Sequence, residues 1–162
     1  YWLIYRDEYF DSVSQKLHFN IFKSYRDRQI TKKITKPEAD IRVLKSRNIG
    51  SNKIVNIEGY DSYVNFTPNL DVLKFMNNTE AVLVPNLTYY PRACFLPPNT
   101  ITDGSVAILT LRNGSRKITN KDLEYYNSEE FTRFYKIARN YGTRSLNIDN
   151  NSVFFFGILK DD

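Results

Sequence analysis

The most informative segment of the chain reads Ser128-Glu129-Glu130-Phe131-Thr132-Arg133-Phe134-Tyr135-Lys136-Ile137-Ala138-Arg139-Asn140-Tyr141. Aromatic and small apolar residues recur at spacings of three, one, three and three positions from residue 131 to 141, which is typical of one face of an α-helix. Gly142 follows directly, and glycine commonly ends a helix. Basic residues at positions 133, 136 and 139 lie on or near the opposite face. The segment therefore predicts a helix that packs on a sheet by one side and can meet an acidic partner by the other.

Most of the remaining chain favours strands. Aromatic residues make up 15% of the sequence, and β-branched runs recur between turn signals. Eight strands are expected, at residues 1–5, 29–34, 41–45, 53–57, 81–87, 93–96, 105–111 and 152–159, with a turn at 49–53. The segment Val153-Phe154-Phe155-Phe156-Gly157-Ile158 lacks alternation, which indicates a strand buried on both faces.

Two shorter helices are expected beside these strands. Residues 69–76 begin with Asn69, a good N-cap, and carry apolar residues at helical spacing. Thr119 and Asp122 have the spacing of a capping box, although Asp is a poorer third-position partner than Glu. Together these elements predict an α+β fold, with a strand-rich, twisted or partly closed β-sheet core and two or three helices.

Length and composition suit one domain over residues 1–162. Of the 162 residues, 41% are hydrophobic and 25% charged, which is enough to bury a sizeable core. No apolar run approaches the roughly 18 residues of a membrane span, so we expect an unanchored, cytoplasmic protein. The chain opens on Tyr1 and its only methionine is Met76, so we expect a fragment of a longer protein.

Motifs for catalysis or metal binding are scarce. One cysteine (Cys94) and one histidine (His18) allow neither an internal disulfide nor a zinc cluster of the usual type. The six glycines form no phosphate-cradling pattern. No Asp or Glu is followed two residues later by Lys, as the metal site of many nucleases would require. We therefore expect binding without catalysis, and no cofactor held by these residues.

The charge distribution indicates an anionic partner. The chain carries 23 Lys and Arg against 18 Asp and Glu, a net charge of +5. Most of the basic residues fall in four segments, at 23–36, 42–53, 112–121 and 133–144. Each segment is a plausible strip of phosphate contacts, and an ordinary solvated surface is the equally weighted alternative.

Arg and Asn residues at loop and strand ends are candidates for reading bases. Arg can pair with guanine and Asn with adenine in the major groove, although Asn in a turn usually serves the backbone. The candidates are Ser46-Arg47-Asn48, Arg112-Asn113, Arg139-Asn140 and Arg144. With phosphate contacts added, the predicted DNA-binding residues are Arg28, Lys32, Lys33, Arg42, Lys45, Arg47, Asn48, Arg92, Arg112, Asn113, Arg116, Arg139 and Arg144.

Three stretches carry a resemblance to a known family. They are residues 41–54 (IRVLKSRNIGSNKI), residues 84–93 followed by 103–109, and residues 141–149 before Phe154-Phe155-Phe156-Gly157. This pattern resembles the target-recognition domain at the C-terminal end of type II restriction-modification adenine-N6 DNA methyltransferases. It is similar also to the recognition domains of type I specificity subunits. The resemblance spans about residues 40 to 160 and is looser than a catalytic fingerprint.

The resemblance implies that DNA recognition and catalysis belong to separate domains of a longer protein. The family's S-adenosylmethionine-binding glycine motif and its Pro-Pro-aromatic catalytic motif are absent here, and both normally precede the recognition domain. A catalytic domain in cis would then hold S-adenosylmethionine, while this chain would grip double-stranded DNA so that the catalytic domain can receive a flipped adenine. The alternatives are an RNA or single-strand binder that uses stacked aromatics, a protein- or carbohydrate-binding β domain, and an unrecognised enzyme.

Overall fold

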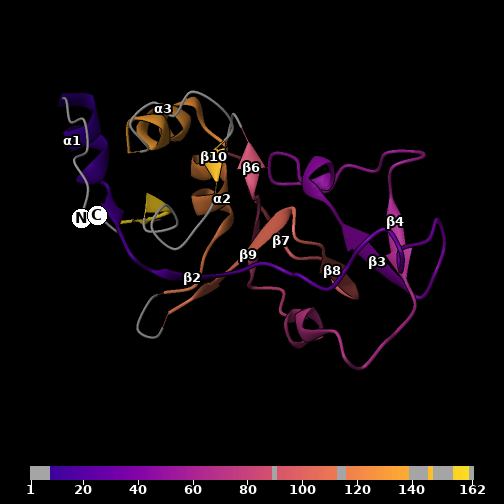
Figure 1. Ribbon diagram of the computed structural model, residues 1–162. Helices are drawn as coiled ribbons and strands as arrows, with labels where there is room; N and C mark the ends of the chain where they lie inside the picture. The colour runs from indigo at the N-terminus through magenta and orange to yellow at the C-terminus, as the bar shows by residue number, and fades with distance from the viewer. Residues whose placement is uncertain (1–7, 89–90, 113–115, 139–145, 148–154, 161–162) are drawn as a thin grey trace.

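The computed structural model describes residues 8–88, 91–112, 116–138, 146–147 and 155–160 (Figure 1). Its helices are α1 (Glu8–Ser14), α2 (Asn120–Tyr126) and α3 (Glu129–Ala138), with 3-10 helices η1 (Ser46–Asn48) and η2 (Asp71–Phe75). Its strands are β1 (Leu17–His18), β2 (Phe22–Tyr25), β3 (Ile41–Leu44), β4 (Ser62–Val64), β5 (Val82–Pro85), β6 (Leu87–Thr88), β7 (Cys94–Phe95), β8 (Thr100–Thr102), β9 (Val106–Leu111), β10 (Leu146–Asn147) and β11 (Ile158–Leu159). None of the helices in these ranges has the length and apolar character needed to cross a membrane.

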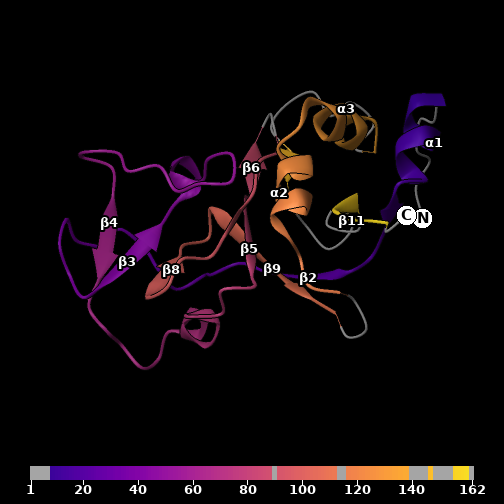
Figure 2. The same ribbon diagram turned by 180° about the vertical axis from the view of Figure 1, so that it is seen from behind.

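A central antiparallel sheet, in the order β2-β9-β5-β7, separates two hydrophobic cores. Side chains alternate between the faces of a strand, so neighbouring residues of β5 and β9 enter different cores. Val82 and Leu109 face one core, whereas Leu83 and Ile108, which pair in register, face the other. The sheet is thus covered on both faces. The α-helices gather at one end of the molecule and β3, β4 and β8 at the other (Figures 1 and 2).

The helical side, which comprises α1, α2, α3 and the β1–β11 pair, has a core rich in aromatic rings. The Phe156 ring lies 5.1 Å from those of both Phe131 and Tyr135, measured between centroids. Tyr126 is fully buried, and its hydroxyl donates a hydrogen bond of 2.6 Å to the carbonyl of Gly157. The helices are therefore joined to the 155–159 segment by ring packing and by a buried hydrogen bond.

The β side is built from the β4-β3-β8 sheet and the two 3-10 helices, over a largely aliphatic core. Strand β3 pairs antiparallel with β4 and parallel with β8. The side chains of Val43 and Leu44 are completely buried, and Ile49 and Ile101 are 1% exposed. This compact support holds the loops described below.

The predicted α+β fold is confirmed, with three α-helices in the described ranges, and there no sheet closes into a barrel. The predicted helix at 128–141 is present as α3 over residues 129–138, and the Ser128 hydroxyl accepts the Phe131 amide at 3.1 Å. Its predicted last residues, 139–141, and Gly142 lie outside the described residues. The capping box is also confirmed, because Asp122 accepts from the Thr119 amide at 2.9 Å at the start of α2.

Several expected elements differ from the structure. Residues 69–76 form only the short η2, capped by Leu70 rather than Asn69. The 29–34 segment is a series of turns, because the Asp27 carboxylate accepts the amides of Gln29 and Ile30 and bends the chain. Of the predicted strand at 53–57, only a single bridge between Ile54 and Ile49 forms.

At the C-terminal end, the predicted strand at 152–159 is reduced to β11 within its described part. Residues 152–154 and the predicted strand at 1–5 lie outside the described residues.

Candidate nucleic-acid interface

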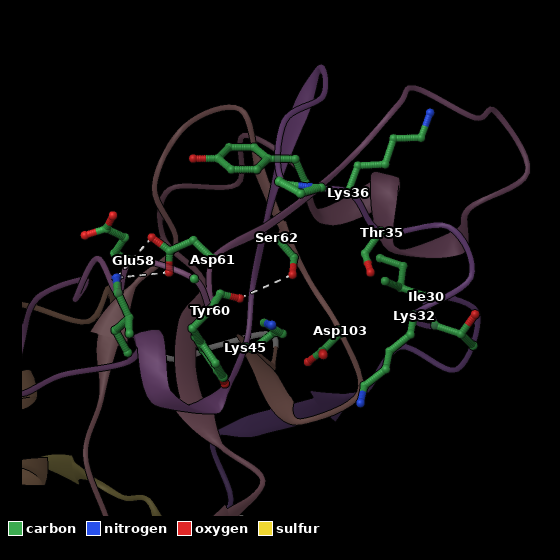
Figure 3. A pocket seen from close by; sticks show the side chains of 15 residues that line it. Ile30, Lys32, Thr35, Lys36, Lys45, Glu58, Tyr60, Asp61, Ser62 and Asp103 are labelled. Carbon is green, nitrogen blue, oxygen red and sulfur yellow. Dashed lines mark hydrogen bonds between the residues drawn. The ribbon is translucent and has the colours of Figure 1, made fainter.

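A pocket of about 720 Å³ opens on the β side, between the 30–37 loop and the 57–63 segment (Figure 3). Three lysines line it: Lys32 and Lys36 from the 30–37 loop, and Lys45 directly after β3. Lys36 is fixed at its backbone, since its amide and carbonyl both bond to Tyr63 at 2.8 Å. This bridge joins the lysine-bearing loop to β4 and sets one wall of the pocket.

The pocket also contains three carboxylates, two of which are engaged within the protein. Asp103 accepts from the amide of Ser105 at 2.9 Å and from its hydroxyl. Asp61 pairs with Arg42 at 3.2 Å, while Glu58 is exposed. Arg42 neutralises Asp61, so the three lysines outnumber the two remaining carboxylates. Lys32 and Lys36 are exposed, and the small net positive charge of the pocket favours an anion.

Tyr60 supports two cations, the pocket residue Lys45 and its neighbour Arg47. The Lys45 ammonium lies 3.9 Å from the centre of the Tyr60 ring, and the guanidinium carbon of Arg47 lies 4.8 Å from it. The Arg47 amide donates to the Tyr60 hydroxyl at 3.3 Å. Cation–π contact restrains both side chains without neutralising their charge. Arg47 stays exposed, so its guanidinium can reach a partner.

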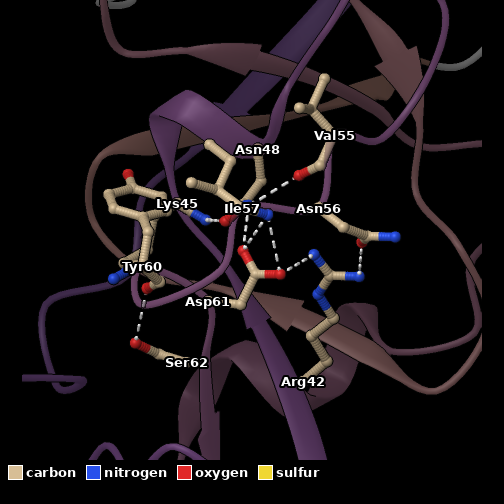
Figure 4. Close-up of polar contacts among 9 residues, drawn as sticks. All are labelled: Arg42, Lys45, Asn48, Val55, Asn56, Ile57, Tyr60, Asp61 and Ser62. Atoms are coloured by element: carbon tan, nitrogen blue, oxygen red, sulfur yellow. Dashed lines mark hydrogen bonds and ion pairs between the residues drawn. The ribbon is translucent and has the colours of Figure 1, made fainter.

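Asn48, the neighbour of Arg47, is completely buried. Its side-chain oxygen accepts the Lys45 amide at 3.0 Å, and its nitrogen donates to Val55 at 2.9 Å and to Asp61 at 2.7 Å (Figure 4). These bonds occupy the amide group. In this conformation Asn48 holds η1 and the following turn together instead of presenting an amide to a base edge.

Arg42 has a similar internal role. Its guanidinium donates to Asp61 at 3.2 Å and to the side-chain oxygen of Asn56, and Asp61 also accepts the Ile57 amide at 3.1 Å (Figure 4). Asp61 therefore connects β3, η1 and the 55–57 segment. This network explains why Lys45 and Arg47 are held beside the pocket.

Three other arginines that were predicted to bind DNA also donate hydrogen bonds within the protein, to backbone carbonyls or to a carboxylate. Arg92 donates to the carbonyls of Ile49 and Ser46, and burial lowers the pKa of its guanidinium. Arg112 is exposed and donates to Phe22 at 3.2 Å. Arg116 forms a fork to Asp122, with distances of 2.8 and 3.0 Å, on the helical side.

The structure thus brings together part of the predicted DNA-binding set. Lys32 and Lys45 line one pocket and Arg47 lies over its Tyr60, while Arg28 and Lys33 are exposed on the loop that carries Lys32. Asn113, Arg139 and Arg144 lie outside the described residues.

The sequence prediction did not select Lys36, Tyr60 or Tyr63 as site residues. Lys36 belongs to a basic run and was detectable from that pattern, whereas the two tyrosines reach the pocket only through the fold. Among the described residues, no group of three or more Asp, Glu, His or Cys side chains is placed to hold a metal ion.

No protein-family model matches this chain, and comparison with curated proteins finds no significant match.

Proposed function

We propose that this chain is a DNA target-recognition module that binds double-stranded DNA in a sequence-specific way. In the intact protein it would serve an adenine-specific methyltransferase of a restriction-modification system, with S-adenosylmethionine held by a catalytic domain elsewhere in the parent chain. The observation that carries the proposal is the convergence of the 30–37 loop, Lys45 and the 57–63 segment on one lysine-lined pocket beside Arg47.

Each side chain has a distinct part in this proposal. The ammonium groups of Lys32, Lys33 and Lys36 are point charges suited to phosphates, which fix the position of a protein on the duplex. Arg47 carries the planar fork that pairs with guanine, and its contact with Tyr60 reduces the entropy lost on binding. One restrained arginine beside exposed lysines is the arrangement expected of a base reader surrounded by backbone contacts.

The aromatic side chains favour a duplex over a single strand. A single-strand binder stacks successive bases on exposed rings. Among the described aromatic side chains, only Phe66 is largely exposed, at 57%. Most of the other described rings are buried or half-buried, many of them in the helical core.

The test is selection of binders from a pool of random duplexes, followed by titration of the enriched and scrambled duplexes against the purified chain. Binding should weaken with salt, with a slope of log K against log salt of about −4 to −6 if roughly four to seven phosphates are neutralised. Lys32→Glu should weaken binding to both duplexes.

The matched control is Lys160→Glu, which reverses an exposed charge on the helical side. It should leave the affinity unchanged. A salt slope near zero, no enriched sequence, or equal losses for the two variants would contradict the proposal.

A further inference from the structure

A second pocket, of about 540 Å³, lies where the two sides of the molecule meet. It is lined from the β side by Ser51, Pro91 and Arg92, and from the helical side by Asn127, Glu129, Thr132, Arg133 and Lys136. Three of these side chains are cationic and one is anionic. The pocket is therefore an electropositive hollow formed by residues of both sides.

Helix α3 presents its polar face to this pocket. Residues 129, 132, 133 and 136 are spaced by three, one and three positions and share one face of the helix, while Phe131, Phe134 and Tyr135 are fully buried in the core. The guanidinium carbon of Arg133 lies 3.9 Å from the centre of the Tyr9 ring. Tyr9 in turn donates to the Glu130 carbonyl at 2.8 Å, so the arginine is supported on a ring that is itself held.

Arg92 supplies charge from the opposite wall. Its position is fixed by donation to Ser46 at 3.1 Å and to Ile49. Burial disfavours the charged form of this half-buried guanidinium, and an anion in the pocket would favour it. The same hydrogen bonds connect the pocket to η1, which carries Arg47.

We propose that this junction pocket binds a phosphate group. Arg92, Arg133 and Lys136 supply the charge, and the hydroxyls of Ser51 and Thr132 add neutral donors, a set that suits a tetrahedral oxyanion. In the complex with DNA the phosphate would belong to the backbone, and this source rests on the proposed function. Since Arg92 bonds to η1, a phosphate bound here would also steady the segment that carries the base reader.

The first experiment needs no DNA. Inorganic phosphate is titrated into the ¹⁵N-labelled chain while the amide signals of Ser51 and Thr132 and the guanidinium signals of Arg92 and Arg133 are followed by NMR. These signals should shift saturably in the wild type and in Lys160→Glu, and not in Lys136→Glu, whose remaining spectrum shows that it is folded. Absence of a saturable shift in the wild type would overturn the proposal, as would an unchanged response in Lys136→Glu.

The second experiment identifies the source of the phosphate. If it is a backbone phosphate, Lys136→Glu should weaken binding to enriched and scrambled duplexes equally and reduce the magnitude of the salt slope by about 1. If instead adenosine 5′-monophosphate saturates the pocket and Lys136→Glu binds duplexes like the wild type, the site takes a free phosphomonoester. A wild type that binds no duplex would refute the proposed function, while the phosphate titration would still decide this one.

Discussion

The two faces of the central sheet are covered in different ways. On the helical side the core is filled by aromatic rings from α1, α2, α3 and the 155–156 segment, whereas on the β side it is mostly Val, Ile and Leu. The loops that carry Lys32, Lys45 and Arg47 belong to the aliphatic side. The difference teaches that large rings join separate helices into a support, while short branched side chains pack the strands that position the candidate DNA-binding loops.

The largest effect is expected from the aromatic core. Phe131→Ala should destabilise the chain by about 3–5 kcal/mol, because it removes a fully buried ring and leaves a cavity. Ile101→Val on the β side should cost about 0.5–1.5 kcal/mol. Denaturant titration followed by circular dichroism measures both values.

This comparison also tests whether the two sides unfold together. Since β5 and β9 contribute residues to both cores, Phe131→Ala should still show one cooperative transition. Two separate transitions would mean that the β side is stable by itself.

The second largest loss of stability is expected from breaking an Arg–Asp ion pair, of which the helical side has Arg116–Asp122 and the β side Arg42–Asp61. The carboxylate of Asp122 is 1% exposed, and that of Asp61 is 18% exposed. Arg116→Ala should therefore cost about 3 kcal/mol, because it leaves a buried charge without its main partner. Arg42→Ala should cost about 1 kcal/mol, since Asp61 keeps its bonds to Asn48 and Ile57. Thermal unfolding of both variants measures the difference, and equal losses would contradict the burial argument.

A third comparison stays on the β side and separates base reading from charge. Arg47→Ala should lose about 1–3 kcal/mol of binding free energy on the enriched duplex and little on the scrambled one. Lys33→Ala should weaken both and reduce the magnitude of the salt slope by about 1. Fluorescence anisotropy on both duplexes measures the four affinities. Equal losses for Arg47→Ala on both duplexes would instead assign its segment a positioning role and direct attention to Arg112 and the 139–144 segment.

The smallest effect is expected on the stability of the folded chain when the solution is acidified. Burial acts to raise the pKa of Asp122, but hydrogen bonds from Arg116 and from the amides of Thr119 and Leu159 outweigh it, and the net pKa is lowered. A lowered folded-state pKa contributes stability that is present above the unfolded value, about 3.8, and is lost as pH falls through the folded value.

The stability advantage of the wild type over Asp122→Asn should therefore be constant from pH 7 to about pH 5 and shrink below about pH 4. Denaturant titrations at several pH values measure it. An advantage that grows on acidification would contradict the assignment.

The sequence predicted those elements whose signals are local. The buried residues of α3 have helical spacing, and Thr119 and Asp122 form their cap within four residues. The β5 and β9 strands also follow from continuous apolar runs. The turns at 29–34 were missed because their composition favours a strand, whereas the bend depends on how the Asp27 carboxylate is used.

The sequence predicted the charged residues of the candidate site but not how they are arranged in space. Lys32 and Lys45 lie in basic runs that are visible in the sequence. The sequence alone does not tell that Arg47 is exposed and its neighbour Asn48 buried. The burial of Asn48 depends on its bond to Asp61, which forms only when the chain returns through the 55–61 segment. Tyr60 also reaches Lys45 only through that return.

The pairing of β1 with β11 has a consequence for the order in which the chain folds. Leu17 lies opposite Leu159, and the Lys160 amide donates to the Lys16 carbonyl, so these contacts join segments from far apart in the sequence. On the ribosome, residues 22–111 emerge before α2, α3 and β11, so the face of β5 and β9 that carries Val82 and Leu109 lacks most of its aromatic cover until they appear. Contacts of such long range also slow folding in general. Completion of the helical side is thus a late step of synthesis, and until then the nascent chain exposes an apolar surface that a chaperone can bind.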